Sequence, residues 1–285
     1  MSNRFELERI SLILTMRCNL KCRDCCVQAP YYREKYHPTL EFIKCEIDRL
    51  FQIADTIRFF SIEGGEALLR GDFAEILEHL VNYKDKIEVE IPIITNGTVL
   101  PDQAVLRAAG LLGEKVRFIV DNYGAISRHV EELASLLEEK HIRCTIRNYD
   151  DDCYCGGWVD LYGNYEKKWD KAGAEALHSR CAWVRKLKGV MEVIGGQIYF
   201  CPASRVFYER GLAVAEDERI RFMDGRPVEE VRRQIRGLFE KRSLAACQYC
   251  GGIHEDSARC KPAVQLTQAE LDRHWLSPEV YREEL

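Results

Sequence analysis

The sequence lacks the apolar stretches that mark export or membrane insertion. Its first nine residues, Met-Ser-Asn-Arg-Phe-Glu-Leu-Glu-Arg, contain no apolar signal core. No later segment approaches the roughly 20 apolar residues of a membrane helix. Repeats of solenoid length and low-complexity tracts are also missing. We therefore expect a cytoplasmic protein that makes no membrane contact.

A basic stripe is missing as well. The formal net charge of the 285-residue chain is −5, and its Lys and Arg residues are dispersed along the sequence. Proteins that bind nucleic acid usually gather basic residues on one face, because phosphate contacts dominate their affinity. We therefore expect no nucleic-acid partner.

Cysteine, by contrast, is abundant. The chain has 13 cysteines, an odd number that does not suit a fully paired disulfide scaffold. In the absence of an export signal, metal or cluster ligation explains them better than disulfides do. With 46% hydrophobic and 31% charged residues, the chain can bury one full core and a smaller appendage.

Short β-rich runs alternate with helical periodicities from the start of the chain to about Asp150. This pattern predicts repeated βα units and a parallel sheet. The fold class that we expect is α/β: a partial (β/α) TIM-like barrel of five or six βα units, with a small C-terminal domain containing a β-hairpin and a helix. Helical spacing is present within residues 40–50, 73–80 and 130–137. The strand candidates are Ile10–Thr15, Ile57–Ile62, Ile87–Thr95, Val116–Asp121 and Ile142–Asn148.

The smaller domain begins near residue 171. Leu187–Ile194 and Gln197–Cys201 flank Gly195-Gly196, which predicts a hairpin with a two-residue turn. A charged helix over Val228–Lys241 precedes the knuckle Cys247-Gln-Tyr-Cys250-Gly-Gly. The predicted division is residues 1–170, residues 171–262 and a tail over residues 263–285.

Three cysteines directly follow the first strand candidate, in Thr15-Met-Arg-Cys18-Asn-Leu-Lys-Cys22-Arg-Asp-Cys25. The C-x3-C-x2-C spacing lets three thiolates of one loop converge on one metal centre. A structural zinc site wants four protein ligands, whereas a 4Fe-4S cluster with three leaves one iron open. Cys26 is a poor fourth ligand, because side chains of adjacent residues diverge. We expect it to be a buried small hydrophobe.

The next two strand candidates also end in distinctive signals. The second runs into Glu63-Gly64-Gly65-Glu66-Ala67, and the third ends in Ile94-Thr95-Asn96-Gly97. Two glycines permit close backbone approach, and the carboxylate after them can accept hydrogen bonds from an ammonium group. In a parallel sheet the working residues lie at these carboxyl ends of the strands.

Together these features resemble the radical S-adenosylmethionine (radical SAM) superfamily, whose cysteine loop, Gly-Gly-Glu motif and Thr-Asn-Gly motif occur in this order. The resemblance implies that Cys18, Cys22 and Cys25 hold a 4Fe-4S cluster whose open iron binds S-adenosylmethionine (SAM). Two positions depart from the family pattern. Asp24 stands where an aromatic residue or His usually precedes the third cysteine, and Ala67 stands where Pro is common.

The resemblance also implies a set of residues near the cofactor. Asp121, which ends the fourth strand candidate, would reach the ribose hydroxyls. An ordinary turn acid is an equally good interpretation of Asp121, and a structural role is the alternative for Asn148. The full implied set is Gly64, Gly65, Glu66, Thr95, Asn96, Asp121 and Asn148.

Four later cysteines, Cys181, Cys201, Cys247 and Cys250, form a second set. Their hairpin and knuckle resemble the twitch form of the SPASM-like auxiliary-cluster domain found in a subset of the family. This resemblance implies a second 4Fe-4S cluster that carries electrons. A zinc ribbon is the alternative, because four cysteines with one C-x2-C pair also suit tetrahedral zinc. Whether Cys260 replaces one of the four ligands stays open.

The resemblance implies a radical SAM oxidoreductase or epimerase. Reductive cleavage of SAM gives methionine and a 5′-deoxyadenosyl radical, which removes hydrogen from a substrate C–H. Electron loss to the auxiliary cluster then gives dehydrogenation, whereas a thiol that returns hydrogen gives epimerisation. Cys153 and Cys155 are candidate hydrogen donors, with plain loop thiols as the alternative. An electron donor such as flavodoxin or ferredoxin is the implied partner.

The substrate class is predicted from a short N-terminus. Only 17 residues precede Cys18, fewer than the leader-recognition domain of many peptide-modifying relatives requires. We therefore expect a carbohydrate, aminocyclitol or nucleotide-sugar substrate, with a ribosomal peptide as the alternative. A glycyl-radical activase is disfavoured, because such enzymes commonly use ferredoxin-like inserts. A zinc-binding interaction protein without catalysis is the alternative from another class.

Overall fold

Two compact units make up the part of the chain that the computed structural model describes, residues 4–149, 158–273 and 275–276. No helix within these residues is long and apolar enough to cross a bilayer. The described residues of unit 1 fall in Met1–Asn19 and His37–Asp151, and those of unit 2 in Leu20–Tyr36 and Asp152–Leu285.

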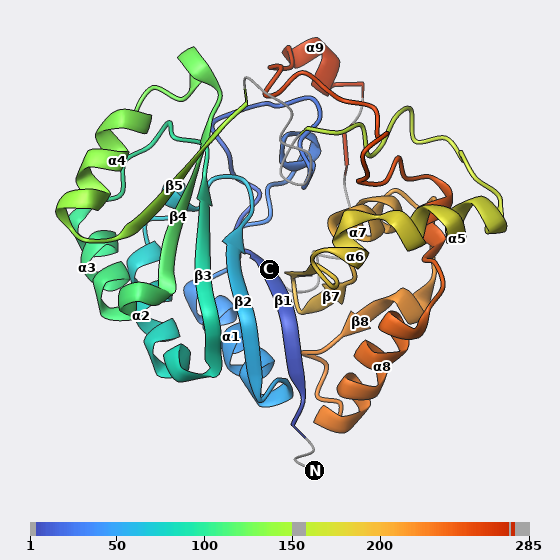
Figure 1. The fold of residues 1–285 in the computed structure, drawn as a ribbon, viewed down its shortest axis with the longest axis horizontal. Coiled ribbons are helices and arrows are strands. Elements are labelled where there is room, and N and C mark those ends of the chain that lie inside the picture. The colour runs from blue at the N-terminus through green and yellow to red at the C-terminus, as the bar shows by residue number, and fades with distance from the viewer. Residues whose placement is uncertain (1–3, 150–157, 274, 277–285) are drawn as a thin grey trace. The chain divides into compact units, whose positions relative to one another are not determined.

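Unit 1 is built on a parallel sheet whose strands lie in the order β5-β4-β3-β2-β1 (Figure 1). Residues of the first strand pair with those of the second from Glu6↔Thr56 to Ile13↔Glu63, so the carboxyl ends of both strands finish together. All five strand candidates are confirmed. Their bounds are β1 (Glu6–Ile13), β2 (Thr56–Glu63), β3 (Ile87–Thr95), β4 (Val116–Asn122) and β5 (Arg143–Asn148).

Helices cover one face of this sheet (Figure 1). They are α1 (Leu40–Ile53), α2 (Phe73–Leu80), α3 (Gln103–Leu112) and α4 (Val130–Glu139). Alternate strand residues point toward them, and Ile10, Phe60 and Phe118 are completely buried. The sequence analysis missed α3, whose start is marked by Asp102. The side chain of Asp102 accepts a hydrogen bond from the backbone N–H of Val105, as a helix N-cap does.

Unit 2 contains the predicted hairpin, in an antiparallel order β6-β7-β8. Its strands are β6 (Met191–Ile194), β7 (Gln197–Tyr199) and β8 (Arg219–Arg221). Gly195 and Gly196 form the turn with φ of 56° and 69°, a conformation that only glycine adopts at no steric cost. The helices are α5 (Lys171–Arg180), α6 (Ala182–Arg185), α7 (Pro202–Glu209), α8 (Val228–Glu240) and α9 (Gln268–Leu271).

Short 3₁₀ helices connect these elements. They are η1 (Ala29–Tyr31), η2 (Ala67–Leu69), η3 (Val81–Lys86), η4 (Gly113–Lys115), η5 (Gly124–Ile126), η6 (Glu216–Glu218) and η7 (Ala245–Gln248).

The units divide differently from the predicted boundaries at residues 170 and 262. Residues 20–36 cluster with the C-terminal part of the chain. The backbone N–H of Arg23 donates to the carbonyl of Val264 (2.8 Å), and that of Leu266 donates to the carbonyl of Lys21 (2.8 Å). The segment predicted as a tail therefore forms backbone hydrogen bonds with the cysteine loop.

A buried charge network holds the core of unit 2. Arg205, on α7, is completely buried and donates to the carboxylates of Glu192 and Glu209 and to the hydroxyl of Tyr32. It also donates to the carbonyl of Val27, at 3.0 Å. Val27 lies two residues after Cys25, and Arg205 lies on α7, whose N-cap residue is Cys201. This one guanidinium therefore links the cysteine loop to α7.

Replacing Arg205 by Met should destabilise unit 2 severely, because it leaves two buried carboxylates without their cation. Breaking a buried ion pair in this way costs about 3–5 kcal/mol of unfolding free energy. The matched control is Arg242→Met, since Arg242 forms an exposed pair with Glu175 at 4.0 Å and should cost under about 1 kcal/mol. Urea unfolding measures both, and equal losses would contradict the account.

Candidate active site

The Gly-Gly-Glu segment after β2 is hydrogen-bonded to the segment after β1. The backbone N–H of Gly65 donates to the carbonyl of Thr15 at 2.6 Å, and that of Glu66 donates to the carbonyl of Arg17 at 2.9 Å. We call this contact the clasp. It fixes the backbone that leads into Cys18, so the first cysteine is positioned by two neighbouring strands.

The clasp requires glycine at both positions. A Cβ atom at Gly65 would lie 2.1 Å from the carbonyl oxygen of Arg17 and 3.1 Å from the Cβ of Cys18. At Gly64, where φ is +141°, a Cβ would lie 2.4 Å from the carbonyl oxygen of Thr15. Both distances to oxygen are shorter than any real contact, so the structure confirms the close backbone approach expected of these glycines.

Glu66 joins the Gly-Gly-Glu segment to the Thr-Asn-Gly segment. Its buried carboxylate accepts the backbone N–H of Asn96 at 2.8 Å and that of Leu68 at 3.2 Å. Burial nevertheless raises the pKa of Glu66 to about 7, against the lowering effect of these hydrogen bonds. A cationic group arriving beside this carboxylate would favour its charged form.

Asn96 reaches the first cysteine. Its side-chain nitrogen lies 3.8 Å from the Sγ of Cys18 and donates to the side-chain oxygen of Asn19 at 3.0 Å. The side-chain oxygen of Asn96 accepts the backbone N–H of Thr98 at 3.0 Å. Glu66, Thr95, Asn96 and Cys18 thus occupy one site at the carboxyl ends of the first three strands of unit 1.

Asp121 and Asn148 lie at the ends of β4 and β5, as predicted, but both are paired with other side chains. Arg147 donates to the two oxygens of Asp121 at 2.5 and 2.9 Å, and the hydroxyls of Tyr123 and Tyr149 lie 3.2 Å from this carboxylate. The strand register places Asp121 directly opposite Arg147. The side-chain oxygen of Asn148 accepts from Asn122 at 2.7 Å.

The sheet face opposite the helices carries charged side chains, of which the sequence analysis had singled out only Asp121. We call them the polar wall. Glu90 accepts from Arg117 and, at 2.7 Å, from Arg143, and Arg9 stacks on the ring of Phe59 at 4.0 Å. Part of this face could have been found from the sequence, because charged residues stand four positions apart in β4 and in β5 and therefore point to one face. The wall consists of Arg9, Ser11, Glu63, Glu90, Arg117, Asp121, Arg143 and Arg147.

Cys22 and Cys25 belong to unit 2, whereas Cys18 belongs to unit 1. The Sγ of Cys22 accepts a hydrogen bond from the side chain of Gln265 at 3.3 Å. Burial raises the pKa of Cys25, and the backbone N–H groups of residues 27–29 lower it. Donors of this kind suit a thiolate ligand, because they offset its negative charge.

Cys26 and Asp24 flank Cys25 in the sequence, and neither was predicted to be a cluster ligand. The prediction that Cys26 is buried was wrong, because its side chain is exposed. The side chains of adjacent residues diverge, so the inward placement of Cys25 turns Cys26 outward. Asp24 forms a hydrogen bond with Cys260, and burial together with this carboxylate raises the pKa of Cys260 to about 12.

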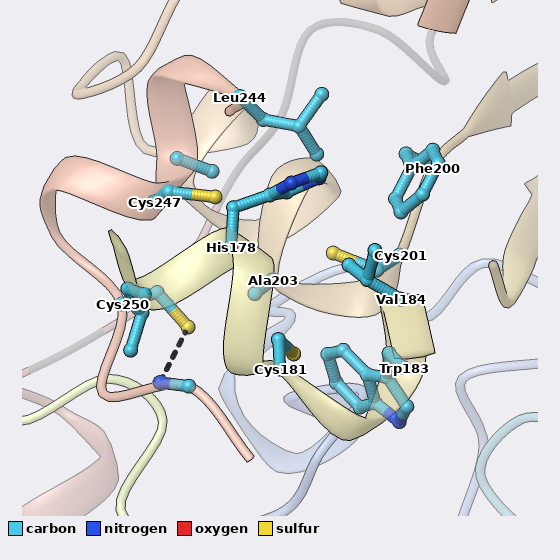
Figure 2. Close-up of a pocket in the computed structure, with 13 residues that line it drawn as sticks. His178, Cys181, Trp183, Val184, Phe200, Cys201, Ala203, Leu244, Cys247 and Cys250 are labelled. Atoms are coloured by element: carbon cyan, nitrogen blue, oxygen red, sulfur yellow. Dashed lines mark hydrogen bonds between the residues drawn. The ribbon is translucent and has the colours of Figure 1, made fainter. Parts of the chain in front are cut away.

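The four cysteines of the second set line one apolar cavity in unit 2. Figure 2 shows the sulfur atoms of Cys181, Cys201, Cys247 and Cys250 directed toward the same space. Cys260 is not part of this lining. The apolar side chains around the cavity are Leu177, Trp183, Val184, Phe200, Ala203, Leu244 and Ala246.

The four thiols of the cavity are candidate ligands of a metal centre. Burial and mutual repulsion raise the pKa values of Cys247 and Cys250 to about 12, so an added cationic centre is needed to hold these thiolates. Among the described residues, no group of three or more His, Cys, Asp or Glu side chains is arranged for one metal ion. Four cysteines around one cavity suit either a tetrahedral zinc ion or an iron-sulfur cluster.

The predicted hydrogen donors Cys153 and Cys155 lie outside the described residues. Their role stays a prediction.

Comparison with known proteins agrees with the geometry of unit 1. The family model "Radical SAM superfamily" matches residues 12–120. A probable GTP 3′,8-cyclase of Methanopyrus kandleri is 36% identical over 110 residues, which are 37% of this chain and 32% of that protein. A GTP 3′,8-cyclase of Campylobacter jejuni subsp. doylei is 31% identical over 113 residues, which are 37% of this chain and 33% of that protein. The matches therefore span about a third of these curated relatives.

A solved structure resembles this chain over a greater length. The complex of BtrN with AdoMet and 2-DOIA aligns with a TM-score of 0.57 and covers 90% of this chain and 96% of that one, at 15% identity. The likeness concerns the fold, an α/β arrangement with a partial barrel. The matched family model runs from the end of β1 into β4 and includes the three motifs, so residues 12–120 of this chain belong to the Radical SAM superfamily.

Proposed function

We propose that this protein reductively cleaves SAM at a 4Fe-4S cluster held by Cys18, Cys22 and Cys25. It then abstracts hydrogen from a C–H of a small, polar substrate, which is dehydrogenated or epimerised. The observation that carries the proposal is the clasp, which brings Cys18, Glu66 and Asn96 to one site. When bound, the cluster and SAM supply a 5′-deoxyadenosyl radical that removes the hydrogen atom.

The residues of unit 1 fit the polar groups of SAM. The carboxylate of Glu66 would accept from the ammonium group, which favours the charged form of an acid whose pKa is raised by burial. The glycines let the segment after β2 lie directly against the backbone that leads into Cys18. Gly64, Gly65, Glu66, Thr95 and Asn96 form the proposed cofactor site. Asp121 and Asn148 lie on the next two strands. They would contact the cofactor only with oxygens that already accept hydrogen bonds from Arg147 and Asn122.

The second cysteine set is proposed to hold an auxiliary 4Fe-4S cluster. Four thiols line the cavity, so each iron would have a protein ligand and no coordination site would remain for the substrate. Such a cluster acts as an electron carrier. Loss of a proton and one electron from the substrate radical gives the dehydrogenated product, and the cluster, held by the four cysteines, would supply the acceptor for that electron.

The polar wall supports a carbohydrate, aminocyclitol or nucleotide-sugar substrate. The Nε atoms of Arg9 and Arg117 are buried and lack a hydrogen-bond partner among the described residues. Buried donors without partners fit a ligand that is rich in acceptor oxygens. The solved BtrN complex contains AdoMet and 2-DOIA, and the matched cyclases are named for GTP. Both names are consistent with small polar substrates.

Incubation of the reduced holoprotein with SAM and deuterated candidates tests this function. We expect deuterium in 5′-deoxyadenosine with a labelled sugar, aminocyclitol or nucleotide sugar, because the radical takes the atom directly from the substrate. Transfer from a labelled peptide instead would overturn the substrate class. Absence of turnover-dependent 5′-deoxyadenosine with every candidate would contradict the proposed chemistry.

Iron analysis tests the two cysteine sets separately. The anaerobically purified protein should contain about eight iron atoms per chain, and Cys22→Ala or Cys250→Ala should each lose about four of them. The control is Cys45→Ala, because Cys45 is exposed on α1 and belongs to neither set. A protein that contains stoichiometric zinc and no iron would support the zinc-binding interaction protein.

Glu66→Gln should remove a pH dependence of stability in the apoprotein. The folded protein keeps the Glu66 proton up to about pH 7, whereas the unfolded chain loses it near pH 4.5. The stabilisation of the folded state by this proton is complete below about pH 4.5 and is lost as the pH rises through about 7. Between them, the wild type should lose about 1.4 kcal/mol of unfolding free energy per pH unit relative to Glu66→Gln. Urea unfolding measures this slope, and parallel curves would refute it.

A further inference from the structure

The segment from Ala263 to Leu276 runs beside the cysteine loop within unit 2. An antiparallel bridge pairs Cys22 with Gln265, and Leu276 donates its backbone N–H to the carbonyl of Tyr31 at 2.7 Å. Arg23 and Glu270 form an ion pair at 2.7 Å. These contacts fix the segment against the loop at several points, so a side chain that it directs at Cys22 is held in place.

Gln265 is that side chain. Its amide nitrogen donates to the Sγ of Cys22 at 3.3 Å and to the carbonyl of Ala263 at 2.7 Å. Its amide oxygen accepts the backbone N–H of Lys21 at 2.7 Å. Because Lys21 offers a donor, the oxygen of the amide must face it, and the two N–H groups must face the carbonyl and the sulfur. The orientation is therefore fixed by the chain itself.

We propose that Gln265 is a positioning residue that hydrogen-bonds the Cys22 thiolate and raises the reduction potential of the N-terminal cluster. The proposal rests on the proposed function, in which Cys22 is a cluster ligand. The proposal assigns a role at the cluster to the C-terminal segment. The sequence analysis predicted residues 263–285 only to be a tail.

The effect follows from charge. A thiolate bound to iron is a stronger acceptor than a thiol, so the N–H···S hydrogen bond strengthens when the cluster is present. Reduction adds an electron, and part of the negative charge resides on the sulfur ligands. A donor to sulfur stabilises the reduced form more than the oxidised form, and hydrogen bonds to sulfur are among the factors that set cluster potentials. Cys22 is only 7% exposed, so water does not replace a lost donor easily.

Two substitutions separate the hydrogen bond from the support of the loop. Gln265→Glu keeps an oxygen for the Lys21 N–H but removes the donor to sulfur and adds a negative charge. Gln265→Leu removes every polar contact of the side chain. The matched control is Gln268→Glu, three residues along the same segment, where the side chain contacts Lys21 Nζ at 3.4 Å and Asp272 at 3.0 Å but no sulfur.

The readout is a redox titration of the holoprotein followed by electron paramagnetic resonance. The N-terminal cluster is identified as the one whose signal changes when SAM is added. We expect its midpoint potential to become more negative in Gln265→Glu and in Gln265→Leu, with the larger shift in Gln265→Glu. The potential of Gln268→Glu and that of the auxiliary cluster should stay at their wild-type values.

Each outcome decides the proposal. Unchanged potentials in both Gln265 variants, with wild-type iron content, would overturn it. Loss of the N-terminal cluster in the Gln265 variants but not in Gln268→Glu would support the positioning role, whereas equal loss in all three would assign the effect to the segment and reject Gln265. If the wild-type protein has no cluster whose signal responds to SAM, the proposed function is refuted. This result is seen in the wild type, so it can be told apart from the outcomes that concern the Gln265 variants.

Discussion

The clasp is the contact on which the site in unit 1 depends. Two backbone hydrogen bonds, Gly65 to Thr15 and Glu66 to Arg17, hold the ends of β1 and β2 together directly before Cys18. A side chain at either glycine would occupy the position of a carbonyl oxygen. Because the same segment supplies the Glu66 carboxylate, one constraint sets both the place of the first thiol and the place of the acid.

The second set of constraints lies in unit 2. Arg205 fixes the backbone of the cysteine loop through the carbonyl of Val27, and it lies on α7, whose N-cap residue is Cys201. The C-terminal segment holds the other side of that loop through Gln265. Arg205 and Gln265, which are far from the cysteine loop in the sequence, therefore hold the loop that carries Cys22 and Cys25. The buried charges of the Arg205 network make this arrangement specific, because neither carboxylate is stable without its cation.

Much of the fold could be predicted from the sequence because its signals are local. The strand β3 was predicted with both ends correct, since β-branched residues dominate Ile87–Thr95. The turn at Gly195 and Gly196 was predicted because two glycines between strands have few other uses. The helix α3 was missed because its core face includes small residues such as Ala108 and Ala109, which give a weak periodic signal.

The site could be predicted only where its residues adjoin a motif. Cys18, Glu66 and Asn96 lie at strand ends, so their association followed from the parallel sheet. Arg147, which pairs with Asp121, and Gln265, which contacts Cys22, depend on strand register and on a contact across more than 240 residues. Neither contact produces a pattern in the neighbouring sequence from which it could be predicted. The exposed position of Cys26 likewise depends on which of two adjacent side chains turns inward.

The central claim is that one iron of the N-terminal cluster has no protein ligand and binds SAM. Electron–nuclear double resonance of the reduced holoprotein with SAM labelled at its amino group with ¹⁵N tests this directly. The account predicts a ¹⁵N hyperfine coupling that appears only when the labelled compound is bound to the cluster. A reduced cluster that shows no such coupling, with SAM present in excess, would contradict it.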